Sequence, residues 1–341
     1  MGHSPYVHAA LLLVIVLLAV GALLAAATVT LMAWSLLRPP RMTDGKAAWL
    51  LQRLSPGDLG MAYEDVRHTV RDTRTGESIE MAAWWIPCDG GGRPSDWTAV
   101  LLHGYADAKV GAIAWAPVWK KLGFNVLALD LRAHGESGGR ESTAGFYERH
   151  DVEQVIGQLR AERPAATRHL VLFGASLGAA VAAATAALRD DLAAVVLESP
   201  FTDFQSAART HMDLLGLPGG LMQAATLRLA QWLGYARFDD IKPVALIRSI
   251  RSPVLVIASA DDVFLGRSGL AALEGAVAAR PADAGPGQFW QVEGTAHLLG
   301  VHADSDAYAG TLRQFLDKAL AASPNSPAPS PGAAEIALQR E

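Results

Sequence analysis

Short apolar runs alternate along the chain with longer segments in which apolar residues recur at helical spacing. The apolar runs predict eight strands, at residues 63–71, 78–86, 98–103, 125–130, 169–173, 194–198, 254–259 and 288–292. The segments between them predict helices at 110–122, 146–162, 177–189, 243–250, 267–279 and 305–321. Most of the later strands are apolar almost throughout, which is typical of parallel strands with both faces covered. The pattern predicts an α/β fold: an eight-stranded, mostly parallel sheet flanked by helices, whose first two strands form an antiparallel pair.

The N-terminal region has a different pattern. Residues 9–37 contain no charged residue and are mostly Leu, Ala and Val, which exceeds the roughly 20 residues that cross a bilayer core. A cleaved signal peptide is the alternative, but it would have a basic start and a shorter apolar run. We therefore expect residues 1–45 to form a single-pass transmembrane helix and a linker. Arg38, Arg41 and Lys46 favour a cytoplasmic location for the rest of the chain, but three charges leave the side open.

The rest of the chain divides into one domain and a tail. Residues 46–322 contain all the predicted strands, and a chain that begins near Lys46 is expected to be soluble and active. Residues 201–242 interrupt the alternation and have helical character, so they predict a small lid, with an extra packing helix as the alternative. Residues 323–341 are rich in Pro and Ser and predict a disordered tail.

Composition narrows the possible partners. Of the 341 residues, 51% are hydrophobic and only 18% are charged, and the mean hydropathy of +0.20 suits a protein that partly contacts lipid. The net charge of −5 provides no basic excess for nucleic acid. The single cysteine, Cys88, excludes an internal disulfide and a cysteine-based metal site. Since the chain also lacks an H-x-x-x-H pair and a G-x-G-x-x-G after a strand, we expect no metal and no nucleotide cofactor.

The candidate chemistry lies where predicted strands end. Residues 174–178 read GASLG, between the strand at 169–173 and the following helix. A turn this sharp needs glycines, because a side chain at Gly174 or Gly178 would collide with neighbouring backbone, and it would expose the Ser176 hydroxyl at a helix N-terminus. Other strand ends are followed by HGY (103–105), DLRAHGESGG (130–139), DD (261–262) and EGTAH (293–297). The order serine, acid, histidine is the one expected for a nucleophile elbow with its partners.

These residue types suit acyl transfer. A serine hydroxyl is a weak nucleophile until a base accepts its proton, and the neutral imidazole of His297 can do so near pH 7. A carboxylate behind the imidazole holds its tautomer and stabilises the imidazolium. Two backbone N–H groups should bind the oxyanion of the tetrahedral intermediate, those of Leu177 and Tyr105.

Together the motifs HGY, DLRAHGESGG, GASLG, SPVLVIASADD (252–262) and GTAH (294–297) resemble those of the α/β-hydrolase superfamily, over about residues 64–320. With GFYERHD at 145–151, the chain is similar to membrane-anchored bacterial serine hydrolases of the serine-aminopeptidase and acylglycerol-lipase-like group. The resemblance implies Ser176 as nucleophile, His297 as base and Asp262 as acid. Ala258-Ser259 replaces the usual His-Gly before the acid, so Asp261 remains an alternative.

The resemblance also assigns roles to other polar residues. It implies that His103 braces the oxyanion loop and that His134 has a structural role. Asp130 and Arg132 are expected to form a local pair that holds their turn, and His302 is the second candidate for the base.

The function that follows is a serine hydrolase that cleaves an ester or related acyl bond of a small acyl substrate through an acyl-enzyme. An aminopeptidase-like amidase or an acyltransferase could use the same residues. A catalytically inactive membrane scaffold is the alternative from another class, although a scaffold has no need of all three residues. The insert at 201–242 is short, so a limited acyl pocket and a preference for short to medium acyl chains are expected. Its walls would come from apolar residues of the insert: Leu214, Leu215, Leu217, Met222 and Trp232.

Overall fold

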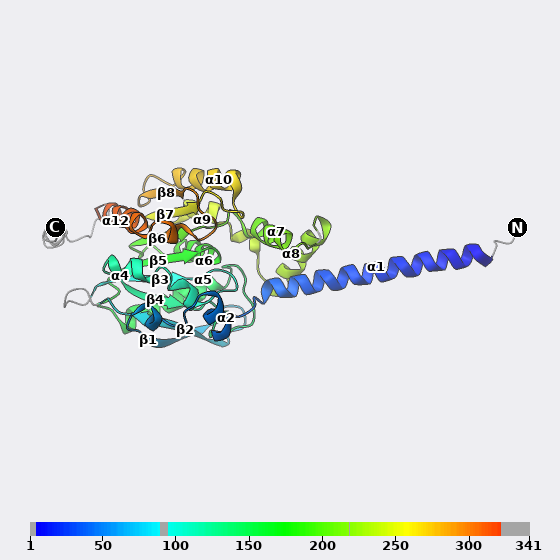
Figure 1. Cartoon of the computed structure of the whole chain (residues 1–341), viewed down its shortest axis with the longest axis horizontal. Coiled ribbons are helices and arrows are strands. Elements are labelled where there is room, and N and C mark those ends of the chain that lie inside the picture. Colours follow the sequence, from blue (N-terminus) through cyan, green and yellow to red (C-terminus); the bar gives the residue numbers. More distant parts are fainter. Residues whose placement is uncertain (1–4, 89–94, 218, 322–341) are drawn as a thin grey trace.

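The computed structural model describes residues 5–88, 95–217 and 219–321, and within them it contains one eight-stranded sheet (Figure 1). The strand order is β1-β2-β4-β3-β5-β6-β7-β8; β2 is antiparallel to β1 and β4, and the remaining pairs are parallel. The strands are β1 (Glu64–Arg71), β2 (Ser78–Ile86), β3 (Trp97–Leu102), β4 (Asn125–Leu129), β5 (His169–Ala175), β6 (Ala194–Glu198), β7 (Val254–Ser259) and β8 (Gly287–Val292). All eight coincide with predicted strands to within about two residues, and the fold class is confirmed.

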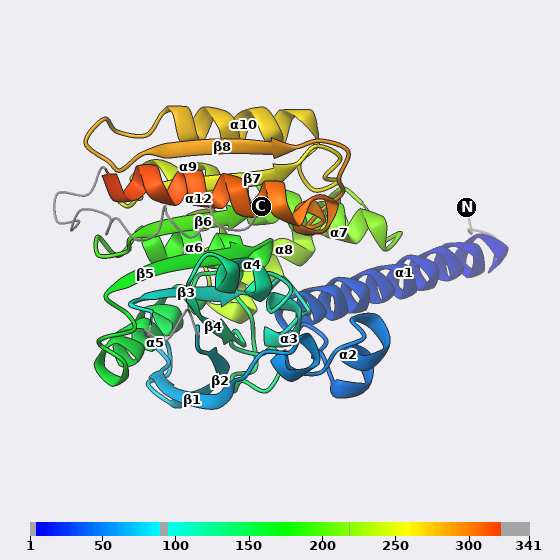
Figure 2. The same ribbon diagram turned by 60° about the vertical axis from the view of Figure 1, so that its left-hand side comes forward.

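Helices cover both faces of the sheet (Figure 2). One face packs against α5 (Glu148–Glu162), α6 (Leu177–Ala186), α9 (Pro243–Ser249) and α10 (Gly266–Ala278). The other packs against α3 (Lys109–Ala112), α4 (Ala116–Lys121) and α12 (Ser305–Ala321), beside the short α11 (Gly300–Ala303). Successive residues of a strand point to opposite faces, so Leu127 enters one core and Ala128 the other. Burial on both faces explains why these strands are apolar throughout.

The helix predicted at 110–122 is two short helices, α3 and α4. Pro117 has no backbone N–H and disfavours helical backbone in the residue before it. The N–H groups of Trp115 and Ala116 accordingly bond to the carbonyls three residues earlier, on Ala112 and Ile113. Proline is tolerated in the first turn of a helix, so α4 begins here.

Helix α1 (Pro5–Leu37) projects from the domain (Figure 1). Of the described helices it is the one long and apolar enough to cross a membrane, and by length and composition it fits either a membrane anchor or a signal sequence. Residues 6–27 are exposed along their whole length. The last turns are not, because Met32, Ala33 and Leu37 are buried in the core of the domain.

The end of α1 is fastened to the domain by polar contacts as well. The carbonyl of Leu37 accepts a hydrogen bond from the N–H of Ser142 at 2.7 Å. After α1, the Arg41 guanidinium donates to the carbonyls of His134, Gly135, Ser137 and Gly139. A short helix, α2 (Asp44–Leu50), and a 3-10 turn, η1 (Pro56–Leu59), lead into β1. The first domain boundary, at residue 45, therefore follows residues that already pack with the hydrolase-like domain.

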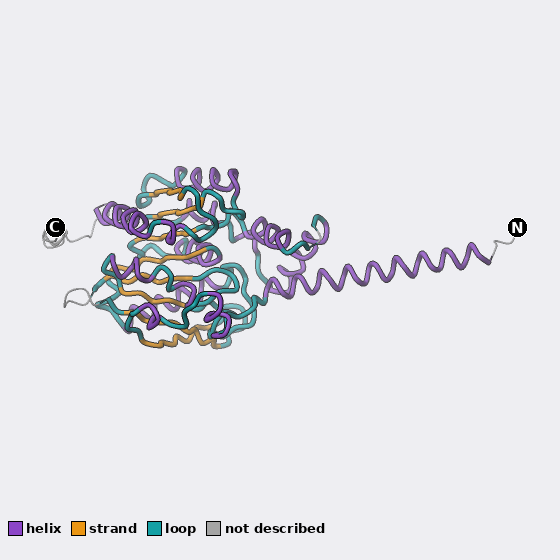
Figure 3. The backbone as a smooth tube through the Cα atoms, viewed as in Figure 1, coloured by secondary structure: helices purple, strands orange, loops and turns teal. Residues whose placement is uncertain are grey.

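The insert between β6 and α9 forms a helical hairpin beside the end of α1 (Figure 3). It comprises α7 (Phe204–Leu214), α8 (Leu221–Gly234) and the 3-10 turn η2 (Phe238–Asp240). Helix α8 packs along α1: Thr226 lies against Met32, with its Oγ1 3.9 Å from the Met32 Sδ. A Cβ atom added at Gly234 would lie 3.1 Å from Leu37. The predicted tail at 323–341 lies outside the described residues.

Candidate functional site

The β5–α6 turn holds Ser176 in a strained conformation. Its φ of 54° and ψ of −112° are unusual for a residue with a side chain. A Cβ atom at Gly174 would lie 2.1 Å from the carbonyl oxygen of Gly178, and one at Gly178 would lie 2.2 Å from that of Leu102. The two glycines therefore allow the strand to turn directly into the helix, as the sequence predicted, and the turn presents Ser176 at the N-terminus of α6.

Three side chains from separate strand ends form a continuous hydrogen-bonded chain. The Ser176 Oγ lies 2.9 Å from His297 Nε2, and His297 Nδ1 lies 2.6 Å from Asp262 Oδ2. The other oxygen of Asp262 accepts the N–H of Phe264 at 2.9 Å, and the Phe264 ring packs on the imidazole with centroids 4.8 Å apart. The Asp262 carboxylate is buried. These contacts fix the orientation of both the Asp262 carboxylate and the His297 imidazole.

The two alternative residues lie elsewhere. Asp261 is exposed, and its backbone N–H bonds to the carbonyl of Thr295. His302 is exposed on α11. The structure therefore brings Asp262 and His297, of the candidates, to Ser176.

The residues predicted to bind an oxyanion border the same space. Leu177 opens α6, where the helix dipole places partial positive charge. Gly104 passes Ser176 so closely that a Cβ atom there would lie 3.6 Å from the serine Cβ, and Tyr105 follows it. The Tyr105 hydroxyl donates to the carbonyls of Ser35 and Leu36 at the end of α1, and burial raises its pKa to about 12, so it stays neutral.

These groups open into an apolar cavity of about 80 Å³. Its walls come from the elbow, the insert, the end of α1 and the loops after β3, β7 and β8. The lining residues are Leu36, Tyr105, Ser176, Leu177, Phe201, Phe204, Ala207, Ala208, His211, Phe264 and His297. The predicted wall residues do not line this cavity: Leu214, Leu215, Leu217, Met222 and Trp232. Leu217 and Met222 are partly buried elsewhere, and the clearest cases are Leu214, Leu215 and Trp232. Those three side chains are exposed, because the face of α7 that meets the cavity carries Phe204, Ala208 and His211.

The two histidines near the elbow, His103 and His134, form hydrogen bonds with backbone groups. His103 is buried; its Nδ1 lies 2.7 Å from the carbonyl of Gly104, and its Nε2 accepts the N–H of Leu131 at 3.0 Å. His134 Nδ1 lies 2.9 Å from the carbonyl of Arg132. Desolvation lowers the pKa of both imidazoles, so both are neutral near pH 7. Their bonds fit the bracing roles implied by the resemblance.

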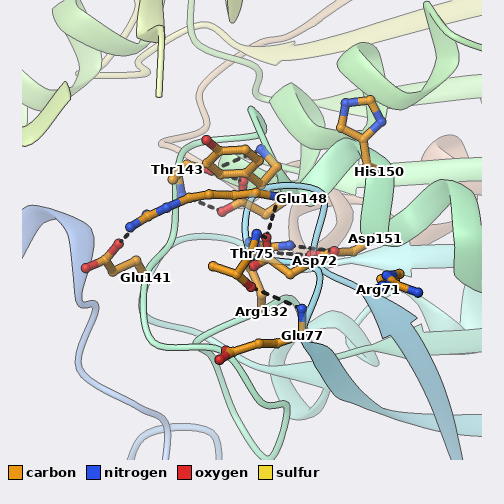
Figure 4. Close-up of polar contacts among 12 residues, drawn as sticks. Arg71, Asp72, Thr75, Glu77, Arg132, Glu141, Thr143, Glu148, His150 and Asp151 are labelled. Atoms are coloured by element: carbon orange, nitrogen blue, oxygen red, sulfur yellow. Dashed lines mark hydrogen bonds and ion pairs between the residues drawn. The ribbon is translucent and has the colours of Figure 1, made fainter. Parts of the chain in front are cut away.

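The expected pair of Asp130 and Arg132 is wrong. Asp130 accepts hydrogen bonds from the backbone and side chain of Lys109. Arg132 instead forms a bidentate pair with Asp151 on α5 and also reaches Asp72 (Figure 4). A guanidinium presents several donors in one plane, so Arg132 links the 130–139 loop to α5 and to the β1–β2 turn.

Glu198 is a buried carboxyl that the sequence argument passed over, although it stands at the carboxyl end of β6. Its backbone carbonyl accepts the N–H of Ser176 at 2.9 Å, and its Oε2 accepts the Tyr308 hydroxyl at 2.7 Å. Burial, with a smaller contribution from the charge of Asp262, raises its pKa to about 8, although the hydrogen bond from Tyr308 acts in the opposite direction. Glu198 is therefore protonated near pH 7.

Leu36, Phe201 and Phe264 also escaped prediction as site residues. Each is an apolar residue whose role depends on which elements meet in space. A lone leucine at the end of a predicted transmembrane helix carries no sequence signal for a cavity wall.

Comparison with known proteins agrees with this architecture. A family model described as serine aminopeptidase, S33, matches residues 93–248, which include Ser176 and end before Asp262 and His297. An uncharacterized Bacillus subtilis protein, YqkD, is 29% identical over 227 residues, covering 64% of this chain and 71% of the relative. The α/β hydrolase domain-containing protein WAV2 of Arabidopsis thaliana is 25% identical over 271 residues, covering 78% and 82%. Among solved structures, the Pyrococcus furiosus esterase Pf2001 matches with a TM-score of 0.64 at 24% identity, over 83% of this chain and 98% of that chain.

Proposed function

We propose that this chain, which has the fold of the α/β hydrolases, is a serine hydrolase that cleaves a carboxylic ester through an acyl-enzyme on Ser176. The observation that carries the proposal is the hydrogen-bonded chain from Ser176 through His297 to Asp262 at the edge of an apolar cavity.

Each group has a defined step in the proposed reaction. His297 Nε2 accepts the proton of the Ser176 hydroxyl as Oγ attacks the ester carbonyl. Asp262, bonded to Nδ1, stabilises the imidazolium that results. The imidazolium then gives its proton to the departing alcohol oxygen, which leaves the acyl group on Ser176. A water molecule, deprotonated by the same imidazole, releases the acid and restores the serine.

The oxyanion would be held by the backbone N–H groups of Leu177 and Tyr105. Both residues border the cavity beside Ser176, and the N-terminus of α6 favours negative charge. One such donor typically contributes a factor of about 10² to 10³ to kcat. The cavity volume of about 80 Å³ is well below the roughly 300 Å³ of a pocket that encloses a drug-sized ligand, which favours short to medium acyl groups.

An aminopeptidase-like amidase is the second candidate, because the matching family model carries that description. Binding a free α-amino group calls for a carboxylate near the acyl site. Among the described residues that line the cavity, none is Asp or Glu. The lining therefore favours an ester over an aminoacyl amide. Transfer of the acyl group to an acceptor other than water would use the same steps.

The apolar length of α1 supports a membrane location. In this proposal the helix stays attached as a single-pass anchor, and the hydrolase domain lies at the membrane surface.

Labelling with a fluorophosphonate tests the proposal. The wild-type chain should be labelled at Ser176 and should hydrolyse p-nitrophenyl esters, with kcat/KM highest at short to medium acyl length, whereas Ser176→Ala should lose both reactions. An unlabelled wild-type chain would favour the inactive scaffold. Cleavage of aminoacyl amides but not esters would favour the amidase.

A further inference from the structure

We propose that Leu214, Leu215 and Leu221, at the tip of the α7–α8 hairpin, form a second lipid contact that sets the hydrolase domain on the bilayer. These three residues are called the leucine tip below. Together with α1 they direct the cavity toward lipid, so the substrate is an acyl ester whose apolar part resides in the membrane. The substrate assignment rests on the proposed esterase activity, whereas the lipid contact rests only on the membrane location proposed for α1.

The position of the leucine tip along the axis of α1 follows from the way α8 packs against α1. The two helices run in the same direction, since Thr226 lies against Met32 and Gly234 against Leu37. Both rise about 1.5 Å per residue. Leu221, five residues before Thr226, is therefore level with about residue 27 of α1, five residues before Met32.

Residue 27 is also where α1 leaves the domain. Residues 6–27 are exposed and uncharged, and 22 helical residues span about 33 Å. The hydrocarbon core of a bilayer is about 30 Å thick. The uncovered part of α1 therefore matches the hydrocarbon core, and its end places the membrane boundary at the leucine tip.

The tip has the character of a lipid-facing surface. Leu214, Leu215 and Leu221 are 61%, 62% and 86% exposed, and the sequence from Leu214 to Leu221 has no charged residue. Burying a leucine side chain in an apolar environment is favourable, because it removes apolar surface from water. The α7–α8 hairpin lies beside the projecting α1 (Figure 1), so lipid around α1 would also cover the leucine tip.

The same elements lead from the tip to Ser176. Helix α7 lines the cavity with Phe204, Ala208 and His211, and its next turn carries Leu214. Helix α1 lines it with Leu36, nine residues beyond residue 27, or about 14 Å along the axis. An ester anchored by its tail in the bilayer would thus reach Ser176 between α7 and the end of α1.

Lipid contact can be measured on the full chain without any activity. Since Cys88 is the single cysteine, a Cys88→Ser background allows Leu215→Cys or Leu221→Cys to be labelled with an environment-sensitive fluorophore. In phosphatidylcholine vesicles, nitroxide groups on the acyl chains should quench both probes strongly. Leu188→Cys is the control, because Leu188 is exposed and follows the far end of α6, which runs away from the elbow. Quenching of the probe at residue 215 that is no greater than at residue 188 would overturn the lipid contact. A probe whose emission indicates an apolar environment but which the nitroxides do not quench would also overturn it, because a protein partner or a second copy would then cover the leucine tip.

The substrate assignment needs a second measurement. A Leu214→Gln/Leu215→Gln variant should hydrolyse a water-soluble short-chain ester like the wild type, but a vesicle-embedded ester at least several-fold more slowly. Equal rates on the vesicle substrate would overturn the assignment. Loss of fluorophosphonate labelling in the wild type would instead refute the proposed function, and the quenching result would stand by itself.

Discussion

Single backbone positions determine whether Ser176 can be presented at all. A Cβ atom at Gly178 would lie 2.2 Å from the Leu102 carbonyl oxygen, which forces the elbow away from β3. We expect Gly178→Ala to lower the free energy of unfolding by more than about 2 kcal/mol and to abolish esterase activity. Gly157→Ala on α5 is the matched control, since its added Cβ has no neighbour within 4 Å, and it should stabilise by about 0.5–1 kcal/mol. Equal melting temperatures for the two variants would contradict this account of the turn.

The acid is a second prediction at single-residue level. Asp262→Asn removes the charge next to His297 Nδ1, so kcat should fall by a factor on the order of 10⁴. Asp261 is exposed, and the carboxylate bonded to His297 Nδ1 is that of Asp262. Asp261→Asn should therefore retain nearly wild-type kcat. Steady-state kinetics on a p-nitrophenyl ester distinguish the two, and the reverse outcome would reassign the acid.

Glu198 makes a third, pH-dependent prediction. Its pKa is raised from 4.5 to about 8 by burial, so between these values the folded chain holds a proton that the unfolded chain has released. The contribution of Glu198 to stability is therefore fully present below about pH 4.5 and is lost as pH rises toward 8. Glu198→Gln removes this loss.

The difference in unfolding free energy between Glu198→Gln and the wild type should thus move in favour of the variant by about 1 kcal/mol per pH unit between pH 5 and 8. Denaturant unfolding at several pH values measures it. A difference that stays constant with pH would show that Glu198 is ionised in the folded chain.

At this scale, sequence reasoning worked where a residue type has a special backbone or chemical role. The glycines around Ser176 and the order serine–acid–histidine were readable from spacing, whereas the structural roles of His103 and His134 were implied by the family resemblance. The ion-pair partners of Asp130 and Arg132 could not be predicted in this way, because Lys109, Asp72 and Asp151 come from other elements of the fold. The choice of partner for a buried charge depends on the packing of the whole loop.

At the scale of elements, the end of α1 behaves as part of the domain core. Leu37 is 2% exposed, whereas Leu18 on the same helix is 68% exposed. Leu37→Ala should therefore lower the unfolding free energy of the hydrolase domain by about 2–5 kcal/mol through the cavity it leaves. Leu18→Ala, the control, should leave it unchanged. Thermal unfolding in detergent compares them, and equal shifts would mean that α1 and the domain are independent.

The elements themselves were largely predictable, since the continuous apolar runs of strands buried on both faces and the helical periodicity between them are visible in the sequence. Two features were not. Pro117 divides a continuous apolar pattern into α3 and α4. The hydrophobic periodicity depends on side chains alone, so it gives no sign of the backbone N–H that proline lacks. The exposed leucines of the α7–α8 hairpin looked like pocket walls because apolar side chains in an insert can face either a cavity or lipid, and only the packing of α8 on α1 distinguishes them.

For the whole molecule, the sequence suggested an anchor joined by a linker to a separable domain, and the packing changes that expectation. Removing residues 1–45 would also remove Met32, Ala33 and Leu37 from the core, Leu36 from the cavity, and the four carbonyl contacts of Arg41. Removing residues 1–27 would take away only the exposed part of α1.

We therefore expect a chain that begins at Thr28 to keep the thermal midpoint of the full chain and its kcat/KM on a water-soluble ester, because Met32, Ala33 and Leu37 in the core and Leu36 at the cavity are all retained. A chain that begins at Lys46 should unfold at a lower temperature and lose at least about tenfold in kcat/KM, because the wall beside Ser176 and several buried side chains are missing. Membrane pelleting should fall for both, so it serves as the control that the spanning segment has gone. If the Lys46 chain matched the Thr28 chain in both melting temperature and kcat/KM, the end of α1 would be an anchor alone, and the cavity would be complete without it.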